Sequence, residues 1–409
     1  MRFKSWLIGL SAIGALFVPT YGSSAEISFQ GIVGDQFSKE ARFRLEGAIQ
    51  VGDSGRLAEA LRKANVSTQD DRWQRIVLAL NSDGGSFHEG IDLAMAIRRV
   101  GISTIVRTDD ECYSACAIAF LGGAERLKDP TPLGENDPLP NQPVSRSLEK
   151  GAKRGFHAPY LTVPDGNYNS ETVQEAYRAA VLGIARLVSL ADSIYVVTAE
   201  LPRLLAPGRD EVYMADDVDA VGFLGIRYTD YSYQIRENFG FTHSMVLNAC
   251  VNRYYHLQRR SSLAGFSTAL SVLDEFVEGS KLMENGEDNI AFGVRRIKQG
   301  TLNTWLAYLP IAKTQDGTRF IWCLFAPDAV SPTTFYKPGG TIEEMFAELK
   351  GKNDLFDFST SDTTVKLGTG DTIGDLMGAL DLVPPQTPLS DIGRQLDTYR
   401  TTEKPIRRP

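Results

Sequence analysis

Three polar residues that could carry out acyl transfer stand in short, distinctive contexts along this chain. Ser114 lies at the centre of Cys-Tyr-Ser-Ala-Cys, His157 stands within Gly-Phe-His-Ala-Pro, and Asp210 precedes Glu-Val-Tyr-Met-Ala. A serine hydroxyl becomes a nucleophile when a nearby base takes its proton, and that base needs a third group that fixes its tautomer. The three residues therefore supply a nucleophile, a base and an orienter.

Each of the three also has an ordinary structural role open to it. Ser114 precedes a short apolar helical pattern, where serine is a frequent N-cap. His157 ends an apolar strand pattern and could be a histidine satisfied within the core. Asp210 could cap the short helix that follows near Ala215. Taken one at a time, the residues leave these alternatives open.

A glycine-containing turn, Asn81-Ser-Asp-Gly-Gly-Ser86, separates an apolar run from a helical pattern. Two glycines permit positive φ angles and let a substrate backbone approach closely. Backbone N–H groups at such a turn can donate to a developing oxyanion. A Gly-Gly turn between a strand and a helix is also common without any function.

The elements that must position these residues alternate between strand and helix patterns. Strands are expected at residues 26–31, 41–49, 75–80 and 102–107, with a further one ending at 157. Helices are expected at residues 54–64, 89–100, 114–121 and 172–190. This alternation predicts an α/β fold with a mainly parallel sheet.

The rest of the chain divides by composition. Residues 128–153 are rich in Pro, Asn, Glu and Ser, which predicts an inserted loop. A smaller C-terminal α+β domain of unknown role is expected at residues 230–383, with a helix near 268–282 and strands at 302–311 and 320–326. Residues 384–409 are expected to form a disordered tail.

Together the four segments resemble the proteolytic subunit of the Clp protease, and look closest to exported bacterial relatives of that family. The resemblance covers about residues 27–227. It implies a Clp/crotonase-type ββα spiral at residues 26–229. It also implies Ser114 as nucleophile, His157 as base and Asp210 as orienter, with the N–H groups of Gly85 and Ala115 forming the oxyanion hole.

Two departures from the family pattern bear on activity. Asp83 stands where the family usually has proline, so it places a carboxylate next to the expected oxyanion hole. The segment 128–153 also separates Ser114 from His157 further than in the cytosolic relatives. Lys153 is an alternative base, because signal-peptide-peptidase relatives of this fold use a Ser–Lys pair.

The first 25 residues have the composition of a signal peptide. Arg2 and Lys4 precede an apolar run at residues 6–18, and small residues lead to a cut after Ala25. The run is too short to span a bilayer comfortably, and no later stretch is long enough to do so. We therefore expect a periplasmic or secreted protein with no integral membrane segment after cleavage.

Four cysteines, an even number in an exported chain, permit two disulfides. We expect Cys250 to pair with Cys323. A Cys112–Cys116 bond is the second candidate. It ranks second because a four-residue spacing within one helix would strain the disulfide, unless Ser114 lies on a sharp turn. Buried free thiols are the alternative.

These observations predict an exported serine peptidase that hydrolyses peptide bonds through an acyl-enzyme on Ser114. The net charge of −8 argues against nucleic acid or an anionic membrane as the main partner. The expected partner is a peptide or unfolded protein, with no dedicated ATPase, cofactor or metal; a homo-oligomer is compatible with this. The rival predictions are an inactive scaffold or binding protein of the cell envelope, and acyl-CoA chemistry of the crotonase kind.

Overall fold

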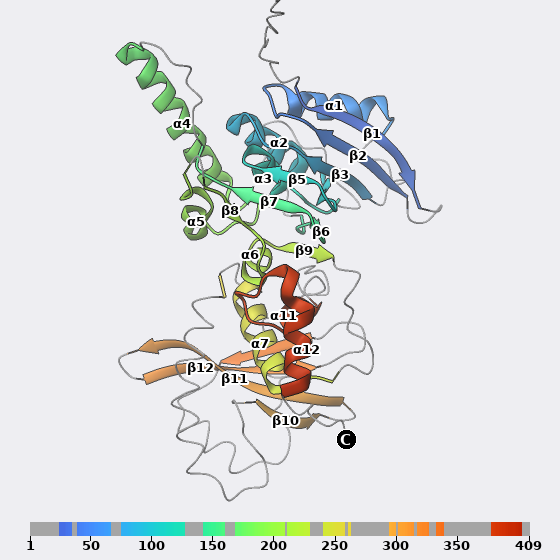
Figure 1. Cartoon of the computed structure of the whole chain (residues 1–409), viewed down its shortest axis with the longest axis vertical. Coiled ribbons are helices and arrows are strands. Elements are labelled where there is room, and N and C mark those ends of the chain that lie inside the picture. Colours follow the sequence, from blue (N-terminus) through green and yellow to red (C-terminus); the bar gives the residue numbers. More distant parts are fainter. Residues whose placement is uncertain are drawn as a thin grey trace, which may run out of the picture.

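The computed structural model (Figure 1) describes most of the first 229 residues and selected parts of the remainder. The described residues are 24–34, 39–66, 75–126, 142–159, 168–208, 211–229, 240–257, 261–262, 294–299, 302–314, 317–326, 333–338 and 378–402. Residues 1–23, which hold most of the expected signal peptide, lie outside them. So does the helix expected near residues 268–282.

A six-stranded, mainly parallel sheet forms the centre of the first part. Its strands, in spatial order, are β1 (Glu26–Val33), β2 (Glu40–Glu46), β3 (Arg75–Asn81), β4 (Ser103–Val106), β6 (Arg146–Glu149) and β9 (Ile226–Thr229). Only β1 runs antiparallel to its neighbour. Ile76 to Leu80 of β3 are buried throughout, because helices or strands cover both faces of this strand.

A smaller sheet lies against the end of β3. It contains β5 (Glu111–Tyr113), β7 (Lys153–Phe156) and β8 (Tyr213–Met214), with β7 in the middle. Strands β5 and β7 are parallel, whereas β7 and β8 are antiparallel. Ser82, just after β3, connects the sheets, since its N–H donates to Glu111 O and its carbonyl accepts from Tyr113 N.

Helices cover these sheets and connect their strands. They are α1 (Asp53–Lys63), α2 (Phe87–Val100), α3 (Ala115–Phe120), α4 (Ser170–Leu190), η1 (Thr198–Glu200), α5 (Leu201–Leu205) and α6 (Val218–Phe223). Ser86 caps α2 by accepting from Glu89 N. The buried Glu89 carboxylate in turn accepts from the N–H groups of Gly52 and Ser54, so α2 holds the start of α1.

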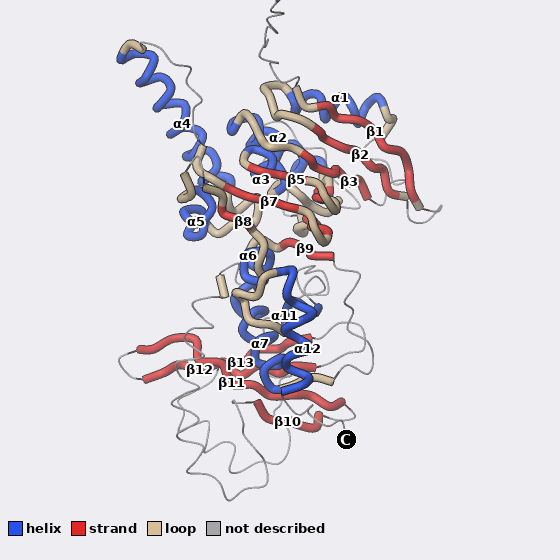
Figure 2. Tube along the Cα trace, in the orientation of Figure 1, coloured by secondary structure: helices blue, strands red, loops and turns tan. Residues whose placement is uncertain are grey.

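Helix α4 extends away from the strands (Figure 2). Its carbonyl at Ala179 lies 3.1 Å from His88 Nε2, and Arg186 pairs with Asp92 at 2.5 Å, so α2 holds its C-terminal half. Several large apolar side chains of α4 are exposed, with Tyr177 the most so. Among the described helices, none combines the length and apolar character needed to cross a membrane.

The C-terminal part joins helices to a second sheet. Its elements are α7 (His243–Leu257), the antiparallel strands β10 (Val294–Gln299), β11 (Leu302–Thr314), β12 (Gly317–Ala326) and β13 (Thr333–Pro338), then α11 (Gly378–Asp381), η4 (Leu389–Asp391) and α12 (Ile392–Thr402). Figure 1 shows α7 crossing this sheet, with α11 and α12 beside it. The Cys250–Cys323 disulfide ties α7 to β12.

A buried polar cluster connects α6 to this C-terminal part. Asp219 accepts from Arg203, Ser261 and Ser262, and its carboxylate lies 3.7 Å from His256 of α7. Gly222 makes room for the His256 ring, because a Cβ at Gly222 would come within 2.0 Å of it.

The structure confirms the mixed α/β fold with its mainly parallel sheet, and it corrects two expectations. The expected loop at 128–153 contains strands β6 and the start of β7, and β6 was missed because its sequence Arg-Ser-Leu-Glu is largely polar. The expected tail from 384 contains helix α12, whose Ile392 and Leu396 are buried.

Candidate active site

Ser114 occupies a strained position between a strand and a helix. It follows β5 directly, precedes α3, and has φ 57° and ψ −121°. Residues other than glycine rarely adopt positive φ, and such strain costs about 1–3 kcal/mol and tends to occur at functional sites. The Ser114 side chain makes no hydrogen bond to the helix it precedes. The Ser114 side chain therefore does not act as the N-cap of α3, the structural role that the sequence left open.

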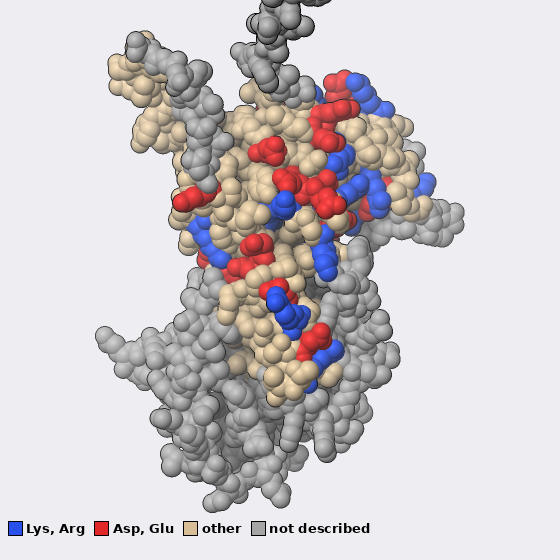
Figure 3. Space-filling view, in the orientation of Figure 1, with Lys and Arg blue, Asp and Glu red and all other residues tan. Residues whose placement is uncertain are grey.

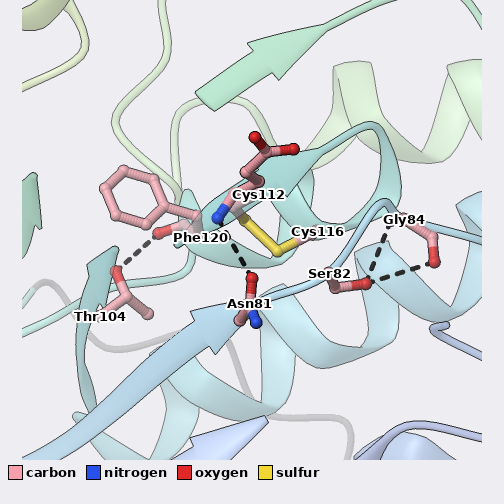
Figure 4. The surroundings of a disulfide bond; sticks show 8 residues. Asn81, Ser82, Gly84, Thr104, Cys112, Cys116 and Phe120 are labelled. Carbon is pink, nitrogen blue, oxygen red and sulfur yellow. Dashed lines mark hydrogen bonds between the residues drawn. A yellow bond between two sulfur atoms is a disulfide. The ribbon is translucent and has the colours of Figure 1, made fainter. Parts of the chain in front are cut away.

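The glycine turn packs directly on Ser114. Gly84 has φ +103°, and a Cβ on it would lie 2.7 Å from Ser114 Cβ and from Tyr113 O. Ser82 fixes the turn, because Gly84 N donates to Ser82 Oγ at 3.1 Å, as Figure 4 shows. The two segments that the sequence associated with chemistry are thus in contact, and only glycine fits at the contact.

Two backbone N–H groups near Ser114 are unpaired within the part of the chain that the structure describes. Among the described residues, no hydrogen bond involves the N–H of Gly85 or that of Ala115. The residues on either side of Gly85 are bonded to Ile49: Ile49 N donates to Gly84 O, and Ser86 N donates to Ile49 O. These two bonds hold the turn in place around Gly85. Fixed, unpaired donors of this kind can bind an oxyanion. Asp83 is exposed, so its carboxylate faces solvent.

His157 follows the strand next to the one that precedes Ser114. The parallel register pairs Tyr113 with Gly155, and Ser114 N donates to Gly155 O at 3.0 Å. Ser114 and His157 therefore stand beyond the carboxyl ends of two adjacent parallel strands, and both are half-buried.

The hydrogen bonding of His157 indicates its tautomer. Its Nδ1 lies 2.7 Å from Ala158 O. A carbonyl can only accept, so Nδ1 carries a hydrogen, and in the neutral ring Nε2 is then the nitrogen that can accept. No hydrogen bond joins Ser114 Oγ to the His157 ring in the described part of the chain.

Asp210 lies outside the described residues, whereas the segments on both sides of it are described. Before it, Pro207 O accepts from Ala158 N at 2.9 Å, and after it Tyr213 pairs with Phe156. Both flanking segments are thus held against the strand end that carries His157. The cap of α6 is Asp217, whose Oδ1 accepts from Ala220 N at 2.7 Å.

Lys153, the alternative base, stands at the opposite end of β7 from His157. Its ammonium pairs with Glu111 at 2.7 Å. The hydrogen bond to Glu111 raises the pKa of Lys153, so this amine keeps its proton. A base must release its proton near neutral pH, and Lys153 is poorly suited to that task.

Two buried arginines, which sequence reasoning missed, support the far end of α3. Arg146 donates to the carbonyls of Leu121 and Leu224 at 2.6 Å each, and also to that of Ile194. Arg154 packs over the rings of Phe120 and Phe156, and burial lowers its pKa to about 9. No periodic signal reveals them, since charged residues in short strands favour an exposed assignment.

Both expected disulfides are present. Cys112 bonds to Cys116 with the Cα atoms 5.2 Å apart, and Cys250 bonds to Cys323 with the Cα atoms 6.0 Å apart. The sharp turn at Ser114 brings Cys112 and Cys116 together, so the two do not lie within one helix. Disulfides are typical of oxidising compartments, which favours a location outside the cytoplasm.

The charge distribution shows no dominant patch in the part that can be described. On the face drawn in Figure 3, basic and acidic side chains are interspersed over the first part of the chain. Within the described residues, no group of three or more His, Cys, Asp or Glu side chains is arranged to hold a metal ion.

Solved structures include distant likenesses to this chain. The chain is similar to a serine-to-alanine mutant of the 1510-N membrane-bound stomatin-specific protease, with 15% identity and a TM-score of 0.27, over 42% of this chain and 70% of that one. No protein-family model matches the chain, and no curated protein sequence matches it.

Proposed function

We propose that this protein is an exported serine peptidase of the Clp-protease type, with Ser114 as its nucleophile. The conformation of Ser114 carries the proposal. This non-glycine residue is held at positive φ against a glycine turn, next to the strand that precedes His157, and its side chain does not cap α3. The mainly parallel sheet and the small second sheet also fit a fold of that type.

In the first step, Ser114 Oγ attacks the carbonyl carbon of the scissile peptide bond. His157 Nε2 takes the serine proton, since the Ala158 carbonyl favours the tautomer with hydrogen on Nδ1. The N–H groups of Gly85 and Ala115 stabilise the negative oxygen, because both are held in place and neither has a partner among the described residues.

In the second step, the C–N bond breaks and His157 returns its proton to the leaving amine. Water then attacks the Ser114 ester with His157 as base, which releases the acid and restores the enzyme. Asp210 would orient His157, since residues on both sides of it bond to the end of β7. Substrates are flexible or already unfolded peptides, because the proposed location lacks an ATP-driven unfoldase.

An inactive scaffold is the second candidate. It is favoured by the lack of a hydrogen bond between Ser114 Oγ and His157 within the described residues. Hydrogen bonds between catalytic groups are often long without substrate and tighten when it binds, so this observation does not outweigh the conformation of Ser114.

A fluorophosphonate probe, which reacts with activated serines, separates the two candidates. We expect the probe to label Ser114, labelling to vanish in Ser114→Ala, and to fall sharply in His157→Ala. Lys153→Ala is the matched control and should label like the parent, because Lys153 is paired with Glu111. A folded parent that remains unlabelled beside a reactive control hydrolase would establish the scaffold.

The variant Asp210→Asn tests the third member of the triad. Loss of the orienting carboxylate lowers turnover by up to about 10⁴-fold in serine proteases, with the fold intact. If Asp210→Asn retains the parent rate, the pair Ser114–His157, supported by the Ala158 carbonyl, is the complete catalytic set.

A further inference from the structure

The Cys112–Cys116 disulfide encloses the proposed nucleophile. Each cysteine is two residues from Ser114, one on β5 and the other in the first turn of α3, and Figure 4 shows the bond joining these two elements. Both cysteines are completely buried. The bond is therefore the covalent closure of a five-residue loop whose middle residue is Ser114.

Hydrogen bonds fix the backbone of this loop on both sides of Ser114, and Ile118 N donates to Ser114 O at 3.1 Å on the helix side. Tyr113 N donates to Ser82 O, and Ser114 N donates to Gly155 O. On the helix side, α3 has only six residues and begins without a side-chain cap. Packing fixes the position of α3, since all six of its residues are buried, whereas the disulfide is the covalent tie that joins its first turn to β5 across Ser114.

We propose that the Cys112–Cys116 disulfide is a positioning device, which keeps Ser114 at positive φ and thereby makes it reactive. This inference rests on the proposed function of Ser114. The bond forms when two thiols transfer two electrons and two protons to an external disulfide, which is reduced to two thiols. Because both sulfurs are buried, reductants reach them poorly once the protein is folded.

The second disulfide provides a matched comparison. In the chain-entropy model, a disulfide that closes a longer loop stabilises a fold more. Cys250 and Cys323 are 73 positions apart, whereas Cys112 and Cys116 are 4 apart. Loss of the Cys250–Cys323 bond should therefore lower Tm more than loss of the Cys112–Cys116 bond, although Ser114 should keep its reactivity.

The experiment compares two double variants, Cys112→Ala/Cys116→Ala and Cys250→Ala/Cys323→Ala, with the oxidised parent. For each protein, Tm is measured together with the maximal rate of fluorophosphonate labelling and the probe concentration that gives half of it. Alanine is used because it leaves no polar group in these buried sites.

We expect the Cys112/Cys116 variant to lose about 5- to 150-fold in maximal labelling rate, the factor by which about 1–3 kcal/mol of released strain depopulates one conformation. Its half-saturating probe concentration should not change, and its Tm should fall less than that of the Cys250/Cys323 variant. The Cys250/Cys323 variant should label at the parent rate.

Other results overturn the inference. Equal maximal rates in the parent and the Cys112/Cys116 variant would leave the bond with a structural role only. The same conclusion would follow if the maximal labelling rate fell in proportion to Tm in both variants. It would also follow if the Cys112/Cys116 variant failed to fold. An oxidised parent that is never labelled would overturn the proposed function together with this inference, whereas the preceding outcomes leave the function standing.

Discussion

Substitution of Gly84 by alanine tests whether the glycine turn positions the nucleophile. The new Cβ would lie 2.7 Å from Ser114 Cβ and from Tyr113 O, whereas carbon atoms in good contact are about 3.5–4.0 Å apart. The φ of +103° adds backbone strain of about 1–3 kcal/mol. Overlap in a packed region adds about 1–3 kcal/mol more, so the expected loss of stability is about 4 kcal/mol.

Gly31→Ala is the matched control. Gly31 has a similar φ of +111°, yet nothing lies within 4 Å of the Cβ that it would gain. This variant therefore reports the backbone strain alone, about 2 kcal/mol. The difference between the variants, about 2 kcal/mol, isolates the contact of Gly84 with Ser114 and Tyr113.

Urea unfolding gives the stabilities, and fluorophosphonate labelling gives the reactivity of Ser114. Relief of the overlap requires Ser114 to move by nearly 1 Å, and a displacement of that size can lower a rate by about 100-fold. Gly31→Ala should label like the parent. If both variants lose the same stability and both are labelled at the parent rate, then the glycine turn does not position Ser114.

Three further predictions concern the supports of the site and the export of the chain. Arg146→Lys should lose about 3 kcal/mol in urea unfolding, because one ammonium cannot serve the three carbonyls that Arg146 reaches, and an unchanged midpoint would contradict this. Burial would raise the pKa of Asp219, but the nearby His256 ring, Arg203 and Ser261 lower it below its usual range. The pKa of an aspartate in the unfolded chain is about 3.9, so Asp219 should stabilise the fold fully above about pH 4 and progressively less below it. In Asp219→Asn, Tm should therefore depend less on pH below about pH 4. N-terminal sequencing of the exported protein should begin at Glu26; a retained leader would contradict the signal-peptide prediction.

The sequence was most informative where apolar residues follow a regular period. The patterns that predicted β3 and α2 come from side chains buried on a sheet or along one helix face, whereas in α4 only Gly183 and Leu187 are buried. The association of Ser114 with His157 was implied by the resemblance to the Clp protease, and the structure places them beyond the ends of the parallel strands β5 and β7.

The same reasoning fails where buried polar groups interrupt the period. Helix α7 was missed because Asn248 and Asn252 are buried on it. The Asn248 amide donates to the Leu382 carbonyl. The Asn252 amide donates to the carbonyls of Asp381 and Val383. Strand β6 was missed because Arg146 is satisfied by distant carbonyls. The positive φ of Ser114 was also out of reach, since sequence patterns carry no signal for strain at a serine.

The contact of residues 385–389 with α6 constrains the order of events during synthesis. The N–H groups of Val218 and Asp219, in the first turn of α6, donate to the carbonyls of Thr387 and Pro385, and Leu389 N donates to Asp216 O. First-turn N–H groups of a helix have no partner within it, so these distant carbonyls complete α6. A nascent chain emerges from its N-terminus, and these donors remain unpaired until residues 385–389 have been made. The segment just after β8 therefore becomes complete only then, and a product that stops before Pro385 leaves it unfinished.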